Sequence, residues 1–369
     1  ANKSDSIFIS KSHLNGALDQ DEVQYSLQRL RHAPYKKAKV LRILKRKNDI
    51  FVGRVYNDKK QIFLNISPYQ SKKIKLLKST KSLPDYTVVK VKIVNWNERG
   101  AVAKGEIIEV ISEPNNFLAD HLYIKHKYLT HRSNYEDNHS LKNFDLEKFI
   151  SKQKHREDFS KLNTFSIDPN DAQDFDDAIS IKLEDNTYEL IVHIADVSEF
   201  IDPDSDLDKA ALQNSNSYYF PEKSYHMLPN ELATKYCSLV PGEKRLAVSL
   251  CFKLTKSCEV ISQRICLSII KNKNRLTYDE VNDILKNNNK STLHNDVSLL
   301  YNIHKVLKKK RLQGGALNLL NTESIFRFGS NGVPSKIIEK KQSDSHSMVE
   351  ECMLLANKFA AKLLASKSY

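Results

Sequence analysis

Residues 167–178 are the most informative stretch of the chain and read Ile-Asp-Pro-Asn-Asp-Ala-Gln-Asp-Phe-Asp-Asp-Ala. Five of the ten positions from Asp168 to Asp177 are aspartate, and carboxylates this close raise each other's pKa unless a cation neutralises them. An EF-hand fails, because Ala172 stands at its fifth position and no start places glycine at the sixth. Oxygen ligands without nearby His or Cys favour Mg²⁺ or Mn²⁺, the ions that clamp phosphates. A solvated acidic turn that caps a strand is the alternative.

The residues that follow predict a β-hairpin. Two apolar-rich segments, 178–183 and 188–194, flank the turn Glu184-Asp185-Asn186-Thr187. Antiparallel pairing across this turn brings residues 174–177 beside residues 194–197. Asp196 then either joins the carboxylates or makes structural hydrogen bonds, whereas His193, within an apolar run, is expected to be a core histidine.

Short alternating segments between Lys39 and Ile111 predict a small β-barrel. Lys90 and Lys92 alternate with valine, which puts charge on one face and the core on the other. A five-stranded OB-type barrel with a basic, aromatic-bearing face commonly binds single-stranded nucleic acid. Phe51, Phe63, Lys90 and Lys92 are therefore candidate RNA contacts. The alternative, favoured for each ring taken singly, is that the aromatic side chains belong to the core.

The rest of the chain completes four expected domains in an α+β protein. Residues 1–33 look like the end of a first barrel, because too few residues precede Ile7 to supply its opening strands. Residues 36–112 form the second barrel, residues 113–163 a mostly helical connector, and residues 164–369 a mixed α/β domain. In that last domain, an apolar stripe follows Ser347, which is expected to cap the final helix. This helix either leaves one side exposed for a partner or packs wholly against a helix at 297–312.

Composition narrows the class of protein. The 369 residues carry 58 Lys and Arg against 45 Asp and Glu, a net charge of +13, and the basic residues crowd positions 36–104. This excess suits a polyanionic partner, although an AT-rich genome also enriches lysine. No apolar run is long enough to span a membrane, and the segment from Ala1 to Asp5 lacks a basic region followed by an apolar run, so a cytoplasmic location is expected. The five cysteines form no CxxC pair and are expected to be buried, reduced thiols.

The acidic stretch resembles the signature of the RNase II/RNase R family of processive 3′-to-5′ exoribonucleases. The resemblance continues through the segments His193-Ile194-Ala195-Asp196-Val197-Ser198, Tyr219-Phe220-Pro221, Met227-Leu228-Pro229, Arg245-Leu246-Ala247, Gly314-Gly315-Ala316-Leu317 and Glu350-Glu351. It covers nearly the whole chain and implies cold-shock OB barrels followed by an RNB catalytic domain. The remnant at Leu14 to Leu18 favours the RNase R branch.

The resemblance also implies roles for individual residues. Asp168, Asp174, Asp176 and Asp177 match the aspartates that hold Mg²⁺, with Asp176 placing the catalytic metal and water. Tyr219 matches a tyrosine that packs against the 3′-terminal nucleotide. Glu350 matches a residue that contacts a ribose hydroxyl, and a capping-box role beside Ser347 is an equal alternative. The implied reaction is two-metal hydrolysis of single-stranded RNA to nucleoside 5′-monophosphates.

The sequence also departs from the family pattern. Asn214 and Ser215 stand where the family usually has Arg-Gly, and His226 stands where proline is usual. The resemblance further implies that the second part of the catalytic domain, with a phosphate-neutralising arginine, is missing, so a second polypeptide is an expected partner. Two alternatives to an exoribonuclease are a catalytically silent RNA-binding protein of the same family and a metal-dependent phosphoesterase that acts on small substrates.

Overall fold

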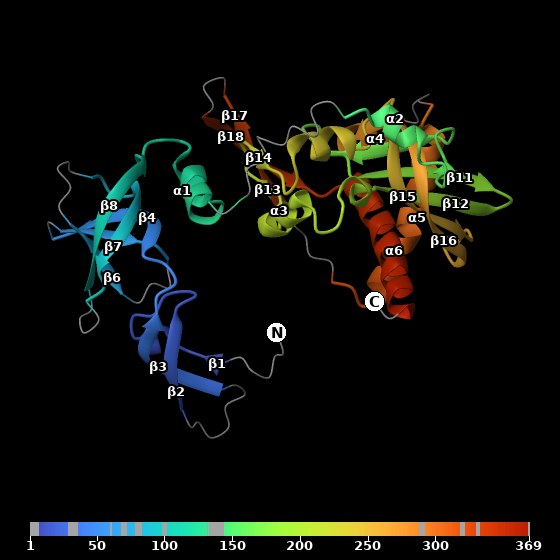
Figure 1. Cartoon of the computed structure of the whole chain (residues 1–369). Helices are drawn as coiled ribbons and strands as arrows, with labels where there is room; N and C mark the ends of the chain where they lie inside the picture. Colours follow the sequence, from blue (N-terminus) through green and yellow to red (C-terminus); the bar gives the residue numbers. More distant parts are fainter. Residues whose placement is uncertain are drawn as a thin grey trace. The chain divides into compact units, whose positions relative to one another are not determined.

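We describe the protein from a computed structural model, in which residues 7–28, 36–59, 61–67, 72–77, 83–97, 102–130, 132, 144–287, 292–317, 322–329 and 333–367 are described (Figure 1). The chain divides into two compact units, Ala1–Arg132 and Ser133–Tyr369. The first unit holds β1 (Ile7–Phe8), β2 (Glu22–Gln28), β3 (Lys36–Lys45), β4 (Ile50–Asp58), β5 (Gln61–Asn65), β6 (Lys73–Leu76), β7 (Val88–Asn95), β8 (Val102–Ser112) and α1 (Ala119–Tyr128).

A closed five-stranded barrel in the order β4-β5-β6-β8-β7 confirms the expected OB-type architecture. Its core includes Leu64, Val89 and Val91, all fully buried. Strand β8 passes between β7 and β6 at Gly105, where a Cβ atom would lie 2.5 Å from Val91 Cγ1. The close packing of the barrel therefore requires glycine at this position.

The boundary between the two barrels differs from the expected one. Strand β3 pairs with β2 and, in parallel, with β1, so it belongs to a three-stranded sheet rather than to the closed barrel. The first sheet thus extends to Lys45, and the closed barrel begins at Ile50. The alternation of β3 fits either sheet, which is why the sequence alone misplaced it. The expected connector is divided as well, because α1 lies in the first unit and packs on β4 and β8.

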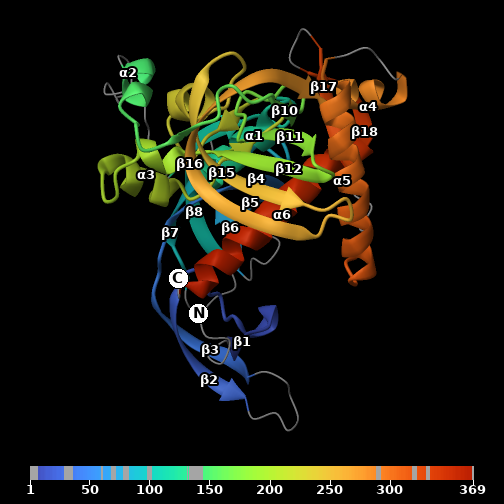
Figure 2. The ribbon, with the colours of Figure 1, turned by 90° about the vertical axis from the view of Figure 1, so that its right-hand side faces the viewer.

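The second unit is built on a six-stranded sheet in the order β10-β11-β12-β15-β16-β9. Its strands are β9 (Glu157–Asp158), β10 (Thr164–Asp168), β11 (Asp177–Glu184), β12 (Thr187–Ala195), β15 (Lys244–Leu254) and β16 (Val260–Thr277). Figure 2 shows β16 as a long, strongly curved strand. The amino-terminal part of β16 pairs with β15, and its last residues pair in parallel with β10. Asp168, at the end of β10, therefore lies beside Thr277.

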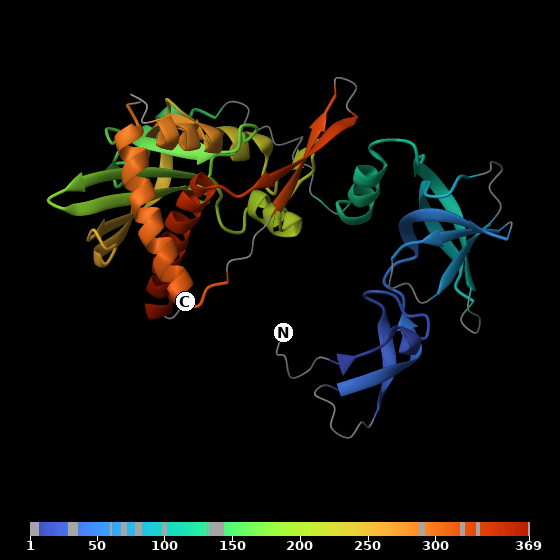
Figure 3. The ribbon, with the colours of Figure 1, turned by 180° about the vertical axis from the view of Figure 1, so that it is seen from behind.

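Helices cover one face of this sheet. They are α4 (Tyr278–Asn287), α5 (His294–Gln313) and α6 (Asp344–Ser366), and Figure 3 shows α5 and α6 side by side along the sheet. The remaining elements are α2 (Leu146–Ser151), α3 (Asp206–Asn214), the short hairpin β13 (Tyr218–Tyr219) and β14 (Ser224–Tyr225), the hairpin β17 (Thr322–Phe328) and β18 (Pro334–Lys341), and three short helical turns, Lys11–His13, Val197–Phe200 and Leu232–Tyr236.

The final helix, α6, packs largely against α5 and the sheet, which follows the expectation that it is covered by its own chain. Met348, Cys352 and Ala356 of α6 are buried in the core that α5 and the sheet share, and Phe359 contacts Phe252 with ring centroids 5.7 Å apart. Leu364 is 52% exposed near the helix end. The expected N-cap at Ser347 is wrong, because α6 begins at Asp344 with Ser343 as its N-cap, and Ser347 is buried within the helix.

Candidate active site

The acidic loop joins two neighbouring strands of the sheet. Asp168 ends β10 and Asp177 begins β11, which pairs antiparallel with β10. Backbone bonds fix the loop: the Ala195 N–H donates to the Asp176 carbonyl at 2.9 Å, and the Leu239 N–H donates to the Phe175 carbonyl at 2.8 Å. The predicted hairpin is confirmed, with Asp177 paired to Ile194.

Arg275 of β16 holds the other end of the loop. One terminal guanidinium nitrogen donates to the carbonyl oxygens of Pro169 and Asn170 at 2.6 and 2.8 Å. The guanidinium carbon also lies 5.2 Å from the centroid of the Phe175 ring. Arg275 thus shapes the loop and lowers the electrostatic cost of the carboxylates beside it.

The electrostatics of the loop agree with a crowded carboxylate cluster. Burial, with smaller contributions from Asp168 and Asp176, raises the pKa of Asp177 to about 7. Burial also raises the pKa of Asp168, and the nearby Arg275 opposes that shift. Partial burial, and to a smaller extent the charge of Asp174, also raises the pKa of Asp176, although this residue remains accessible to solvent. Mutual repulsion of this kind is relieved when a cation binds.

The donor set fits a magnesium ion. The Oδ2 atom of Asp168 is buried and has no hydrogen-bond partner in the protein, so a cation or a water can satisfy it. All the nearby acidic ligands are oxygen donors, which Mg²⁺ prefers. No three His, Cys, Asp or Glu side chains among the described residues are already arranged around one point as metal ligands. The aspartates of the loop are therefore not preformed as a metal site, and side-chain rotations would be needed for them to hold one ion.

Tyr219 lies over the acidic loop, as expected for a residue of the site. Its hydroxyl donates to Asp174 Oδ2 at 2.7 Å, and partial burial together with this bond raises the pKa of Tyr219 to about 12. The residue is otherwise 63% exposed, so most of its ring is accessible. His226 faces the same oxygen, with Nδ1 3.8 Å from Asp174 Oδ2 and its ring edge-on to Tyr219.

Asp196 and His193 both have structural roles. Asp196 is 3% exposed and accepts hydrogen bonds from Arg156 at 2.6 Å and from Ser198 at 2.8 Å. Of the two roles considered for Asp196, these contacts support the structural one. His193 is buried between Ser180 and Ser249, 3.0 and 2.6 Å from their hydroxyls. Burial lowers its pKa to about 3, so it is neutral at ordinary pH, as expected of a core histidine.

Glu350 is already engaged within the helical layer. It accepts from Arg311 of α5 at 3.2 Å and from Gln342 at 3.1 Å. Because the N-cap of α6 is Ser343, paired with His346, Glu350 is not part of a capping box. Each oxygen of Glu350 accepts one of these bonds, so the carboxylate keeps acceptor positions that a ribose hydroxyl could use.

The candidate RNA contacts of the barrel divide into two groups. Phe51 is half-buried and packs against the barrel core, edge-on to Trp96, whereas Phe63 is 6% exposed and stacks on Tyr56 with ring centroids 5.5 Å apart. Neither side chain presents an open ring for base stacking. Lys90 and Lys92 lie on the outer face of β7, opposite Glu109 and Glu106 of β8. The predicted separation of charge and core on β7 is confirmed, but each lysine has an acidic residue as its cross-strand neighbour.

Sequence reasoning missed Arg275 as a residue of the site and did not place His226 there. Each reaches the acidic loop from at least about 50 residues further along the chain, and Arg275 belongs to no recognisable local motif. The unusual histidine before Met227 was the one available signal.

Comparison with known proteins places this arrangement in a family. Residues 156–369 match the RNB domain. The chain belongs to the RNB domain family. Ribonuclease R from Chlamydia trachomatis is 33% identical over 96% of this chain and 53% of its own length, and Ribonuclease R from Aquifex aeolicus is 30% identical over 90% and 49%. The chain thus spans about half the length of the curated relatives it matches.

Two solved structures share the fold of this chain. The apo form of Mycoplasma genitalium RNase R superimposes with a TM-score of 0.81 at 24% identity, covering 98% of this chain and 58% of its own. The structure of yeast Ssd1, described as a pseudonuclease, gives a TM-score of 0.65 at 18% identity over 94% of this chain and 44% of its own. The expected membership of an exoribonuclease family and the expected fold are therefore confirmed. None of the described helices is long and apolar enough to cross a membrane.

Proposed function

We propose that this chain carries the metal-binding part of a cytoplasmic 3′-to-5′ exoribonuclease that hydrolyses single-stranded RNA to nucleoside 5′-monophosphates. The observation that carries the proposal is the carboxylate cluster at the junction of β10 and β11, in which Asp168 Oδ2 is buried without a partner. Oxygen ligands that repel one another in this way are suited to Mg²⁺ beside a phosphodiester.

In this proposal, Asp168, Asp174, Asp176 and Asp177 would hold the metal. Bound Mg²⁺ supplies Lewis acidity and an activated water, and two such ions would stabilise the attacking and leaving oxygens together. Arg275 keeps the loop in place through the Pro169 and Asn170 carbonyls. Because these contacts fix the backbone of the loop, they keep the four carboxylates close together despite their mutual repulsion.

Tyr219 would orient the terminal nucleotide. Its hydroxyl is tethered to Asp174, and its exposed ring is free to pack against a base. The tether places a stacking surface one side chain away from a metal ligand. This arrangement favours a substrate whose last base stacks while its terminal phosphodiester meets the carboxylates.

RNA binding without cleavage is the second candidate function. The Ssd1 structure shares this fold and is described as a pseudonuclease, so the fold by itself does not establish cleavage. The four aspartates distinguish the candidates, because a silent binder has no need to keep a cluster whose repulsion costs stability. On this argument the exoribonuclease is the better proposal.

The test compares Asp176→Asn with Asp171→Asn, since Asp171 is an exposed aspartate of the same loop. We expect Asp176→Asn to abolish Mg²⁺-dependent cleavage of 5′-labelled single-stranded RNA while RNA affinity stays within about twofold, and Asp171→Asn to leave both unchanged. Equal losses of cleavage and binding in Asp176→Asn would contradict the assigned role. The same assay, run with and without a polypeptide that corresponds to the other half of the Ribonuclease R relatives, tests whether a second chain is required.

A further inference from the structure

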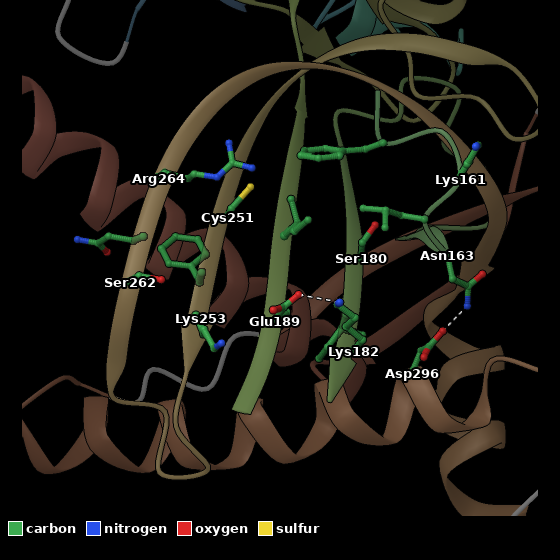
Figure 4. Close-up of a pocket in the computed structure, with 16 residues that line it drawn as sticks. Lys161, Asn163, Ser180, Lys182, Glu189, Cys251, Lys253, Ser262, Arg264 and Asp296 are labelled. Carbon is green, nitrogen blue, oxygen red and sulfur yellow. Dashed lines mark hydrogen bonds and ion pairs between the residues drawn. The ribbon is translucent and has the colours of Figure 1, made fainter. Parts of the chain in front are cut away.

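The charged lining of a cavity of about 720 Å³ on the sheet is largely paired within the protein (Figure 4). Lys182 contacts Glu189 at 3.0 Å, and Arg264 donates two hydrogen bonds to Glu157. Because these charges offset one another, the cavity does not indicate the charge of a ligand. The aromatic side chains beside the acidic loop are more informative, since they lie next to a proposed metal ligand.

Tyr219 combines an accessible ring with two contacts that hold different parts of its side chain. Its hydroxyl donates to Asp174 Oδ2 at 2.7 Å, and its ring packs on His226 with centroids 6.1 Å apart and planes 85° apart. The hydroxyl oxygen lies on the axis about which the ring turns, so this hydrogen bond fixes the tip of the side chain and leaves the ring plane free. That torsion is broad unless packing restrains it. The plane of the Tyr219 ring therefore depends on its contact with His226.

His226 is held firmly enough to restrain a neighbouring ring. It directly follows β14, and the Met227 backbone after it is bonded on both sides. The Met227 N–H donates to Ser217 Oγ at 2.9 Å, and Asn214 Nδ2 donates to the Met227 carbonyl at 3.0 Å. Asn214 is the last residue of α3 and is itself buried. The side chain of His226 is only 12% exposed, so it is enclosed by the protein.

The imidazole of His226 acts through packing rather than through a hydrogen bond. Its Nδ1 lies 3.8 Å from Asp174 Oδ2, which is beyond hydrogen-bond distance. The same oxygen already accepts the bond from the Tyr219 hydroxyl. The nearly perpendicular contact with the Tyr219 ring is, by contrast, a favourable geometry for two aromatic side chains.

We propose that His226 is a positioning residue that sets the plane of the Tyr219 ring and so presents its face to the last base of an RNA strand. Asp174 fixes the tip of the tyrosine and His226 fixes the ring, which orders the stacking surface before RNA binds. Such preorganisation lowers the entropic cost of binding. The inference rests on the proposed role of Tyr219 and assigns no substrate contact to His226 itself.

The first test needs no RNA and uses the full chain with 3-fluorotyrosine at position 219. By fluorine NMR, we expect the resonance of the wild type to be displaced from that of the unfolded chain. His226→Ala should move it toward the unfolded value, whereas His226→Phe keeps a ring at this position and should leave it displaced. His155→Ala makes the same change at an exposed histidine and should have no effect. An unchanged resonance in His226→Ala, with the fold confirmed by circular dichroism, would overturn the proposal.

The second test measures base stacking without cleavage. In the presence of EDTA, each protein is titrated with oligouridylate that carries 2-aminopurine either at its 3′ end or near its 5′ end. Stacking on an aromatic side chain quenches this fluorescent base, so the wild type and His226→Phe should quench the 3′-terminal probe. His226→Ala should lose most of this quenching and bind the RNA about fivefold more weakly. All three proteins should affect the probe near the 5′ end alike.

The outcomes separate this inference from the proposed function. Terminal quenching that survives in His226→Ala would overturn the inference. Equal losses in His226→Ala and His226→Phe would assign the effect to the approach of Nδ1 to Asp174, and would also overturn it. If the wild type itself fails to quench the terminal probe, the proposed role of Tyr219 fails, and the fluorine resonance alone then decides whether His226 sets the ring plane.

Discussion

Asp177→Asn should stabilise the metal-free protein at alkaline pH. The pKa of Asp177 in the folded chain is about 7, against an ordinary value of 3.8, mainly because of burial. A raised folded-state pKa means that the stabilising contribution is complete below pH 4 and is lost as the pH rises through 7. A shift of about three units corresponds to about 4 kcal/mol at most, and the half-buried position of Asp177 reduces it to about 2 to 3 kcal/mol through solvent screening.

Asparagine has nearly the same volume as aspartate and carries no charge, so it removes the penalty at high pH. Desolvation of its amide offsets about 1 kcal/mol of this gain. The net expectation is that the variant is more stable than the wild type by about 1 to 2 kcal/mol at pH 8, and no more stable at pH 4.

Urea unfolding of the metal-free protein at several pH values, followed by circular dichroism, measures this difference. Addition of Mg²⁺ at pH 8 should raise the stability of the wild type more than that of the variant, because the ion neutralises the carboxylates. A variant that is destabilised equally at pH 4 and pH 8 would refute the argument that Asp177 is held in an unfavourable charged state.

Three further outcomes are expected. Ser215 has φ of 63° and ψ of −42°, a backbone conformation that favours glycine. Ser215→Gly should therefore raise the free energy of unfolding in urea by about 1 kcal/mol, and a variant less stable than the wild type would contradict this. Asp196→Asn should cost about 3 kcal/mol in the same assay, because Arg156 keeps Glu199 but loses the negative charge of its buried partner; an unchanged midpoint would argue against that role. RNA affinity measured by anisotropy should fall steeply with salt and show little base preference.

Local patterns predicted the parts of the site that are close in sequence. The spacing of the aspartates and the hairpin that follows gave the pairing of Asp177 with Ile194, because a short turn fixes the register of its two strands. Tyr219 was found through a motif rather than through its contact with Asp174. Its hydroxyl bond spans 45 residues, and no periodicity in the sequence encodes it.

Ambiguous signals account for the remaining differences. Ser343 and Ser347 both precede an apolar helix and both have a polar residue three positions later, so either could act as N-cap, and the packing of Ser347 into the core decides between them. Phe63 is buried by stacking on Tyr56 of β4 and by Lys73 over its ring rather than within the barrel core, and these contacts depend on strand pairing that the local pattern does not encode. The contact of Arg275 with the loop depends on β16 curving back to β10, which is likewise non-local.

The central claim is that the aspartates of the acidic loop form a divalent-metal site, and isothermal titration calorimetry with Mg²⁺ and Mn²⁺ tests it without requiring RNA or cleavage. Titrations near pH 7, in two buffers with different ionisation enthalpies, should show saturable binding with proton release, because the raised pKa of Asp177 leaves that carboxyl partly protonated. Asp176→Asn should weaken binding at least about tenfold, and Asp171→Asn should bind as the wild type does. Absence of saturable binding, or equal affinity in the wild type and Asp176→Asn, would contradict the account.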